Sequence, residues 1–94
     1  MPASARRVVD VVVTGRVQGV SFRYHAERTA RGLGVAGWVR NEPGGSVAAH
    51  LEGDPETVEA MLDWLRQGPP AASVDRVDVT PATPTGARSF EVRS

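Results

Sequence analysis

The sequence predicts an α+β domain in which an antiparallel sheet carries two helices on one face. The chain has 94 residues, enough for one small domain over residues 1–94 but too few for a two-domain enzyme, a large barrel or a doubly wound dinucleotide-binding fold. Apolar residues alternate in five short segments, as in strands, and recur with helical spacing in two longer ones. These segments come in the order βαββαβ with a short terminal strand, which is the split βαβ or ferredoxin-like arrangement.

The composition excludes several classes of function. Eleven basic residues balance eleven acidic ones, so a surface for nucleic acid or an anionic membrane is not expected. The lack of cysteine excludes a disulfide framework and a thiolate nucleophile, and two histidines are too few for most metal sites. Asp10 interrupts the valine run near the N-terminus, and no segment approaches the roughly 18 apolar residues of a membrane span. We therefore expect a cytoplasmic monomer without a metal.

The first half of the chain reads as strand, loop, helix and hairpin. Residues 1–6 are small and polar, and we expect them to be frayed. Valines alternate over residues 9–14, which predicts a strand, and a glycine-bearing loop follows at Gly15–Gly19. A helix is predicted from about Phe22 to its glycine stop at 32–34, because its apolar residues share one helical face. Those residues are Phe22, Ala26, Ala30 and Leu33.

The second half repeats the pattern. Residues 35–40 and 47–52 alternate around a turn cluster at 41–45, which predicts a hairpin. Asp54 is the expected N-cap of a second helix with Pro55 at its first position, and Gly68 ends that helix. The apolar stripe of this helix consists of Val58, Met61, Leu62 and Leu65. Residues 73–80 form the fourth predicted strand, and residues 90–92 form a fifth at a sheet edge.

This topology brings three polar features to one end of the sheet. A helical crossover joins the first two strands, so they run parallel and their carboxyl ends meet. The Gly15–Gly19 loop follows one strand, Asn41 ends the other, and Arg23 lies in the first turn of the helix after the loop. Loop N–H groups, a helix N-terminus and a guanidinium can together bind a phosphate. Taken locally, glycines in this pattern more often form a plain connecting turn, and the loop matches neither a Walker nor a dinucleotide motif.

Two motifs in this region resemble those of a known family. Residues 14–23, TGRVQGVSFR, resemble the acylphosphatase signature G-x-V-Q-G-V-x-F-R. Residues 37–41, GWVRN, followed by Gly45, resemble the second signature of that family, G-W-V-x-N-x-x-x-G. The resemblance covers about residues 7–93. Two ordered motifs at the right separation are far more specific than either alone.

The resemblance implies a fold, an activity and a set of site residues. Acylphosphatases are ferredoxin-like and hydrolyse the mixed anhydride of a carboxylic acid and phosphate without a metal or organic cofactor. The implied partner is a small-molecule acyl phosphate. By motif position, Arg23 binds the phosphoryl group and Asn41 positions the attacking water. The residues implied for the phosphate-binding loop are Gly15, Arg16, Val17, Gln18, Gly19 and Val20, of which we expect the Arg16 side chain to lie on the surface.

Other functions remain as alternatives at this point. The main one is a non-catalytic ferredoxin-like module that binds a phosphorylated metabolite. A domain specialised for carbamoyl phosphate, as in hydrogenase-maturation proteins, is disfavoured because those domains sit in long chains with zinc-finger segments. An RNA-binding module is disfavoured by the zero net charge.

The remaining polar and aromatic residues are expected to have structural roles. Ser21 has no evident base to activate it as a nucleophile. His25 is expected to be a partly exposed helix residue, and His50 a surface residue on its strand. Trp38 and Trp64 are expected to be packing residues.

Overall fold

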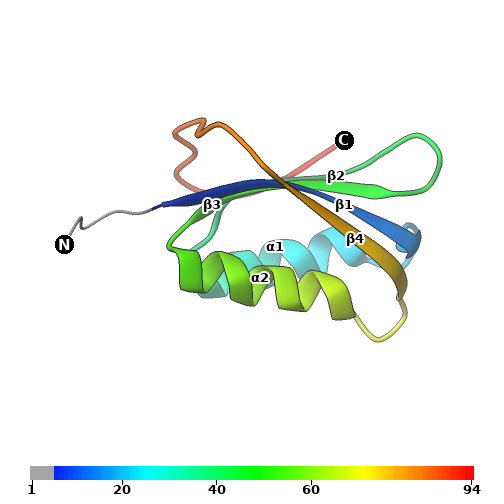
Figure 1. The fold of residues 1–94 in the computed structure, drawn as a ribbon. Coiled ribbons are helices and arrows are strands. Elements are labelled where there is room, and N and C mark those ends of the chain that lie inside the picture. The colour runs from blue at the N-terminus through cyan, green and yellow to red at the C-terminus, as the bar shows by residue number, and fades with distance from the viewer. Residues whose placement is uncertain (1–5) are drawn as a thin grey trace.

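The computed structural model describes residues 6–94, which form five strands and two helices (Figure 1). The elements are β1 (Arg7–Arg16), α1 (Phe22–Leu33), β2 (Ala36–Asn41), β3 (Val47–Gly53), α2 (Pro55–Gln67), β4 (Ser73–Pro81) and β5 (Phe90–Arg93). All seven predicted elements are present in the predicted order. The expected fraying of residues 1–6 lies outside the described residues except for Arg6, which is exposed and precedes β1.

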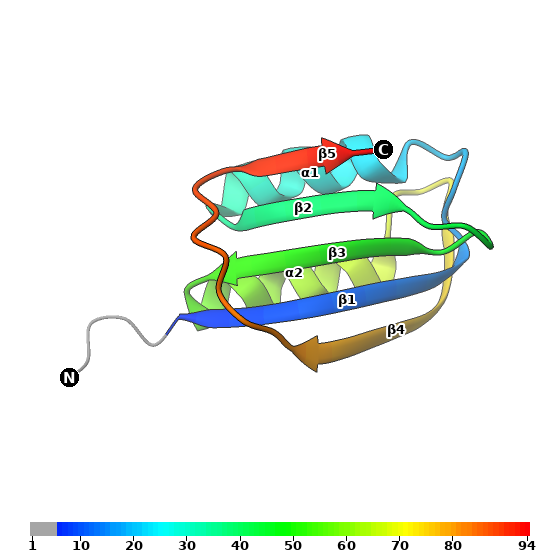
Figure 2. The ribbon, with the colours of Figure 1, turned by 90° about the horizontal axis from the view of Figure 1, so that it is seen from above.

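The sheet has the strand order β4-β1-β3-β2-β5 (Figure 2). β1 pairs antiparallel with β3 and β4, and β2 pairs antiparallel with β3, as a ferredoxin-like fold requires. The sequence predicts an antiparallel sheet. β5 instead pairs in parallel with β2, so the sheet is mixed. The reason lies in the connection, residues 82–89. It crosses the sheet at the end where β2 begins, so β5 starts beside β2 and runs in the same direction.

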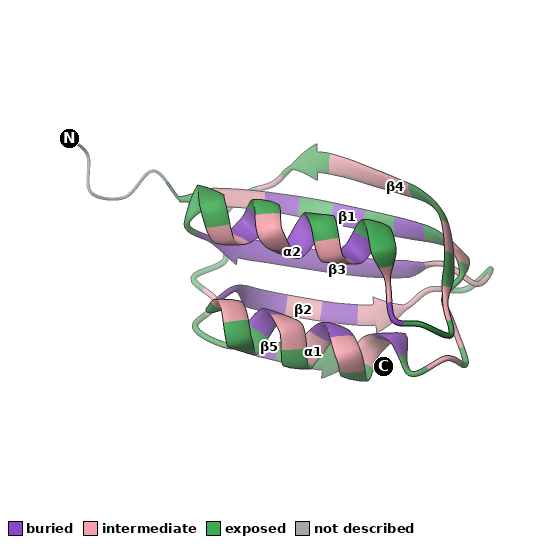
Figure 3. Ribbon diagram, turned by 90° about the horizontal axis from the view of Figure 1, so that it is seen from below, coloured by how far each residue is buried: buried purple, intermediate pink, exposed green. Residues whose placement is uncertain are grey.

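The core lies between the sheet and the helices, which cover one face of the sheet (Figure 3). The buried residues of α1 are Phe22, Ala26 and Ala30, and those of α2 are the predicted Val58, Met61, Leu62 and Leu65. From β1, Val9, Val11 and Val13 join the same cluster. Burial of one large apolar side chain contributes about 1.5–3 kcal/mol, so this layer contact is the main stabilising element of the fold.

The helix ends follow the sequence signals with one difference. Gly34 ends α1 and Gly68 ends α2, each through a main-chain hydrogen bond back into its helix. Asp54 precedes Pro55 as predicted, but its side chain makes no capping hydrogen bond. The Asp54 carboxylate is exposed, so water can satisfy it in place of the helix N–H groups. Neither helix described within residues 6–94 is long and apolar enough to cross a membrane.

The prediction that His50 is a surface residue is wrong. His50 is 4% exposed and Glu52 is 1% exposed, although both alternate with the core residues of β3 and so face away from the helices. The connection between β4 and β5 crosses this face (Figure 1), and the Thr85 N–H and hydroxyl both donate to Glu52 Oε2. The Trp38 ring of β2 stacks on His50 with ring centroids 6.1 Å apart. The polar residues that alternate with the core residues of β3 therefore form a buried cluster, and this face of the strand is not exposed to solvent.

This polar cluster joins β1, β3 and the crossing connection. His50 Nδ1 lies 2.7 Å from Asp10 Oδ1, and His50 Nε2 lies 2.7 Å from Glu52 Oε2. Burial by itself lowers the pKa of His50, but the hydrogen bonds to the two carboxylates outweigh it and raise that pKa above 6.5. Burial by itself raises the pKa of Glu52, but hydrogen bonds from Thr85 and His50 lower it to about 2.

Candidate active site

The chain enters the site through a bulge at Gly15. The pairing of β1 with β4 shifts register between Thr14 and Gly15. Gly15 has a φ of 135°, and a Cβ at this position would stand 2.3 Å from the main-chain oxygen of Ser73. Only glycine tolerates this conformation and this close approach. The bulge turns the chain out of the sheet and into residues 17–21, which lead to α1.

Residues 17–21 place main-chain N–H groups at the N-terminus of α1. Ser21 is the N-cap, and within residues 6–94 it is the one non-glycine residue with a positive φ, 59°. Its carbonyl accepts the first helical hydrogen bond, from the His25 N–H, so its main chain starts the helix. No carbonyl of the described residues accepts a hydrogen bond from the N–H groups of residues 18–21. These free donors, together with those of the first helical turn, can bind an anion.

Arg23 is held toward this loop by the last strand. It lies in the first turn of α1, and its Nη1 donates a hydrogen bond to the main-chain oxygen of Arg93 at 2.8 Å. A guanidinium has five N–H donors, so the remaining ones can form a bidentate contact with a phosphate. The position of β5 beside β2 therefore sets the direction in which Arg23 points.

Asn41 reaches the site from β2. It is the last residue of that strand and pairs with Val47 across the hairpin. The Gln18 side chain ties the phosphate loop to the turn that follows Asn41. Its Nε2 donates to the main-chain oxygens of Glu42 and Ser46, both at 2.8 Å. The sequence motif assigns Gln18 to the phosphate loop but does not predict that its side chain binds the hairpin turn. The only sequence signal for this contact is the presence of a glutamine in the first motif.

An open pocket of about 560 Å³ lies where these segments meet. Arg23 and Asn41 both line it, although they come from a helix and from the end of a strand. The other lining residues are Val17, Gly19, Ser21, Phe22, Tyr24, Glu27 and Val92. The structure thus brings together the two residues expected to carry the chemistry and two residues of the expected loop.

The other four residues of the expected phosphate loop do not line this pocket. Gly15 turns the chain, and Gln18 holds the hairpin turn. Arg16 is exposed, as predicted, and pairs with Ser73 of β4. Val20 packs against the core. The phosphate-binding role of all six loop residues stays a prediction.

Arg23 and Glu27 carry the formal charge of the pocket. Glu27 Oε2 also lies 3.3 Å from Arg31 Nη2, which offsets part of its negative charge. A phosphate in the pocket would therefore meet the remaining donors of the Arg23 guanidinium and the main-chain donors of the loop. Among residues 6–94, no group of three or more His, Cys, Asp or Glu side chains is arranged to hold a metal ion.

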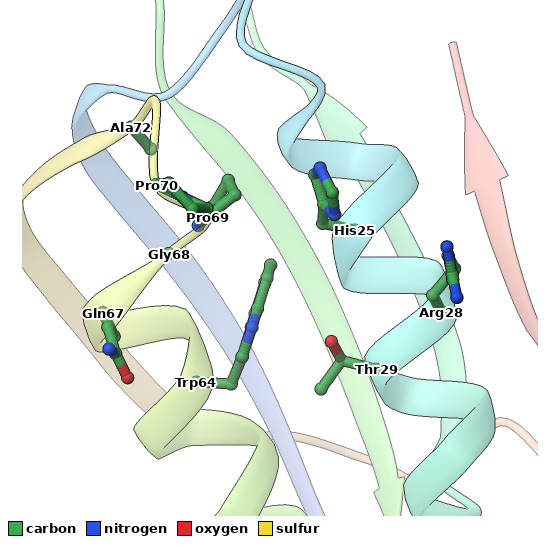
Figure 4. A pocket seen from close by; sticks show the side chains of 9 residues that line it. All are labelled: His25, Arg28, Thr29, Trp64, Gln67, Gly68, Pro69, Pro70 and Ala72. Carbon is green, nitrogen blue, oxygen red and sulfur yellow. The ribbon is translucent and has the colours of Figure 1, made fainter.

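A second open pocket, of about 600 Å³, lies between the two helices (Figure 4). Trp64 of α2 stands on one side of it, and His25 and Arg28 of α1 stand on the other. Trp64 also packs on Phe22 with ring centroids 5.4 Å apart, which confirms its packing role. His25 is partly exposed as predicted. We place the site in the slightly smaller pocket because both motif side chains line that one.

The fold and the pocket define a small ferredoxin-like domain with a glycine-bearing loop of free N–H groups between its first strand and first helix. The sequence profile of the acylphosphatase family matches residues 9–92. An acylphosphatase of Nocardioides sp. is 64% identical over 88 residues, which are 94% of this chain and 89% of that protein. An acylphosphatase of Thermococcus kodakarensis is 56% identical over 80 residues, 85% of this chain and 88% of that one.

Solved structures agree with the sequence matches. The acylphosphatase of Coxiella burnetii superposes with a TM-score of 0.90 at 33% identity, covering 94% of this chain and 93% of that one. For the acylphosphatase of Bacillus subtilis the TM-score is 0.89 at 31% identity, covering 93% and 98%. The chain belongs to the acylphosphatase family. These matches confirm the predicted fold and favour an acylphosphatase over the non-catalytic binding module.

Proposed function

We propose that this chain hydrolyses acyl phosphates to a carboxylate and inorganic phosphate in the pocket lined by Arg23 and Asn41. The Arg23 guanidinium and the main-chain N–H groups of residues 15–20 bind the phosphoryl group, and the Asn41 amide positions the attacking water. One observation carries the assignment: Arg23 of α1 and Asn41 of β2 line a single pocket together with the loop that has free N–H donors.

The leaving group explains why so few side chains suffice. A carboxylate has a pKa of about 4, so it departs as an anion without a general acid. Phosphoryl transfer passes through a loose transition state, so catalysis is mainly positioning and stabilisation of charge. The water oxygen bonds to phosphorus while the bond from phosphorus to the acyl oxygen breaks, and the electron pair of that bond leaves with the carboxylate.

Asn41 suits the positioning of water better than the abstraction of its proton. A carboxamide is a very weak base, but its oxygen accepts a hydrogen bond and can orient the water for attack. The proton of the water passes to an oxygen of the transferred phosphate, so no protein base is required. The contact of Gln18 with the turn after Asn41 limits the movement of the amide.

The test is hydrolysis of benzoyl phosphate in the presence of EDTA by the wild type and by the variants Arg23→Lys and Asn41→Ala. Loss of a charge-stabilising or positioning group in such a site costs about 10²–10³ in rate, so each variant should fall at least about 100-fold. Arg76→Lys and Gln67→Ala are matched controls, because both residues are exposed and lie outside the pocket. A folded wild type without turnover would sink the proposal and make phosphate binding by titration the next measurement.

We also propose that the acyl phosphate is the only ligand of this site and that the chain acts in the cytoplasm as a monomer without nucleic acid. The zero net charge argues against a nucleic-acid surface, and the absence of cysteine fits a reducing compartment. Sedimentation of the purified chain, with and without added RNA, tests the monomer and the nucleic-acid parts. A faster-sedimenting species at micromolar concentration would contradict them.

A further inference from the structure

Two exposed apolar side chains stand beside the phosphate-binding groups. Tyr24 is 53% exposed and Val92 is 40% exposed, and both line the pocket that contains Arg23 and Asn41. Among residues 6–94, Val12 is the other large hydrophobic residue with comparable exposure, 40%. Val12 lies between the buried Val11 and Val13 of β1 and therefore faces away from the helices and the pocket. Exposed apolar side chains beside a few polar groups in one pocket are typical of a ligand contact.

Tyr24 and Val92 flank the hydrogen bond that holds Arg23. Tyr24 follows Arg23 on α1, and Val92 precedes Arg93 on β5, whose carbonyl accepts that bond. Arg28 holds the Tyr24 side chain: its Nη1 donates to the tyrosine oxygen at 3.3 Å, and its guanidinium carbon stands 5.7 Å from the ring centroid. Both apolar groups are therefore fixed relative to the guanidinium that binds the phosphate.

The geometry points to Tyr24 and Val92 as the surface that contacts the acyl group, an inference that rests on the proposed function. The acyl group of the substrate is joined to the phosphate through a single oxygen, so it must lie next to the phosphate. The pocket of about 560 Å³ is far larger than a phosphate group, and these two side chains line it together with Arg23. They give the enzyme a preference for acyl groups with apolar or aromatic surface.

Glu27 adds a charge criterion to this preference. It lines the same pocket one helical turn after Arg23, and Arg31 offsets its charge only in part. An acyl group that carries its own carboxylate would meet this like charge. The preferred substrates are therefore acyl phosphates whose acyl group is both uncharged and apolar.

The test compares benzoyl phosphate with acetyl phosphate in the wild type, Tyr24→Ala, Val92→Ala and the control Val12→Ala. The measured quantity is the ratio of kcat/KM for benzoyl phosphate to kcat/KM for acetyl phosphate. Tyr24→Ala should lower this ratio about tenfold and Val92→Ala about threefold, mainly through a higher KM for benzoyl phosphate. Val12→Ala removes the same exposed valine surface outside the pocket and should leave the ratio unchanged.

The outcomes separate this inference from the proposed function. An active wild type whose ratio does not change in Tyr24→Ala or Val92→Ala, with folding confirmed by circular dichroism, overturns the acyl contact alone. A folded wild type that hydrolyses neither compound overturns both. For the charge criterion, Glu27→Gln should raise kcat/KM for succinyl phosphate relative to benzoyl phosphate about two- to threefold at low salt and less at high salt. An unchanged ratio would remove Glu27 from the acyl surface.

Discussion

The guanidinium of Arg23 donates a hydrogen bond to the main-chain oxygen of Arg93, a residue 70 positions later in the chain. This bond connects the start of α1 to the end of β5 at the rim of the pocket. Arg93 lies in β5, which pairs with β2, and β2 ends at Asn41. The paired strands β2 and β5 at one edge of the sheet therefore position both Asn41, proposed to orient the water, and Arg23, proposed to bind the phosphate.

Deletion of residues 93–94 should lower kcat/KM for benzoyl phosphate about tenfold, because the released guanidinium loses its fixed direction. The thermal midpoint should change little, since β5 keeps Phe90, its buried residue. Deletion of Ser94 alone is the control, because Arg93 then keeps a main-chain oxygen that can accept the bond. Equal activity of the two truncated chains would show that the bond does not orient Arg23.

The bridge from Gln18 to the hairpin turn should affect kcat more than KM. Gln18→Ala removes the two hydrogen bonds to Glu42 and Ser46 and so loosens the turn after Asn41. We expect kcat to fall about tenfold, because the amide that orients the water is then less well placed. Gln67→Ala on α2 serves as the control amide. Steady-state kinetics with a melting curve for each variant would check this, and a rise in KM at constant kcat would place Gln18 in substrate binding instead.

Gly15 should be among the positions least tolerant of a methyl group. Gly15→Ala combines a φ of 135° with a Cβ 2.3 Å from the Ser73 oxygen, so we expect a loss of about 2–4 kcal/mol in the free energy of unfolding. Gly32→Ala is the matched control. Gly32 lies in α1, where an added Cβ would meet nothing within 4 Å, and the substitution should stabilise by about 0.5–1 kcal/mol. Urea denaturation of both variants measures the difference, and equal effects would contradict the bulge geometry.

The His50–Glu52 cluster should make stability depend on pH. The pKa of His50 is raised above 6.5 in the folded state, so its stabilisation is complete below about 6.5 and is lost as the pH rises through the raised value. The pKa of Glu52 is lowered from 4.5 to about 2, so its stabilisation is present above 4.5 and is lost as the pH falls toward 2. The free energy of unfolding should therefore be largest between these limits.

The variant His50→Gln separates the loss of stability at high pH, the alkaline limb, from the loss at low pH, the acid limb. It removes the titrating ring but can still donate to a carboxylate, so the decline in stability above pH 6.5 should disappear while the acid limb remains. Urea denaturation from about pH 3 to about pH 9 measures both limbs. An alkaline decline that persists in His50→Gln would assign it to another group.

The prediction of the fold was correct for the elements whose position follows from the local spacing of apolar residues and glycines. The apolar spacing of Phe22, Ala26 and Ala30 and the glycine stop after it placed α1 correctly, because a helix must bury one face against its neighbour. The direction of β5 was not predictable from its few residues, since it depends on where the connection from β4 crosses the sheet. His50 was misplaced for a related reason: its neighbours Asp10 and Trp38 come from β1 and β2, and no local pattern in β3 reveals them.

The sequence by itself determined the order of the elements, the composition of the core and the two motifs that contain Arg23 and Asn41. These properties follow from the periodicity of apolar residues and from short stretches of the chain. Only the tertiary structure decided that Gln18 reaches the hairpin turn, that Arg93 holds Arg23, and that Tyr24 and Val92 face the same pocket. Each of these contacts joins segments far apart in the chain, so it exists only once the sheet has brought its strands together.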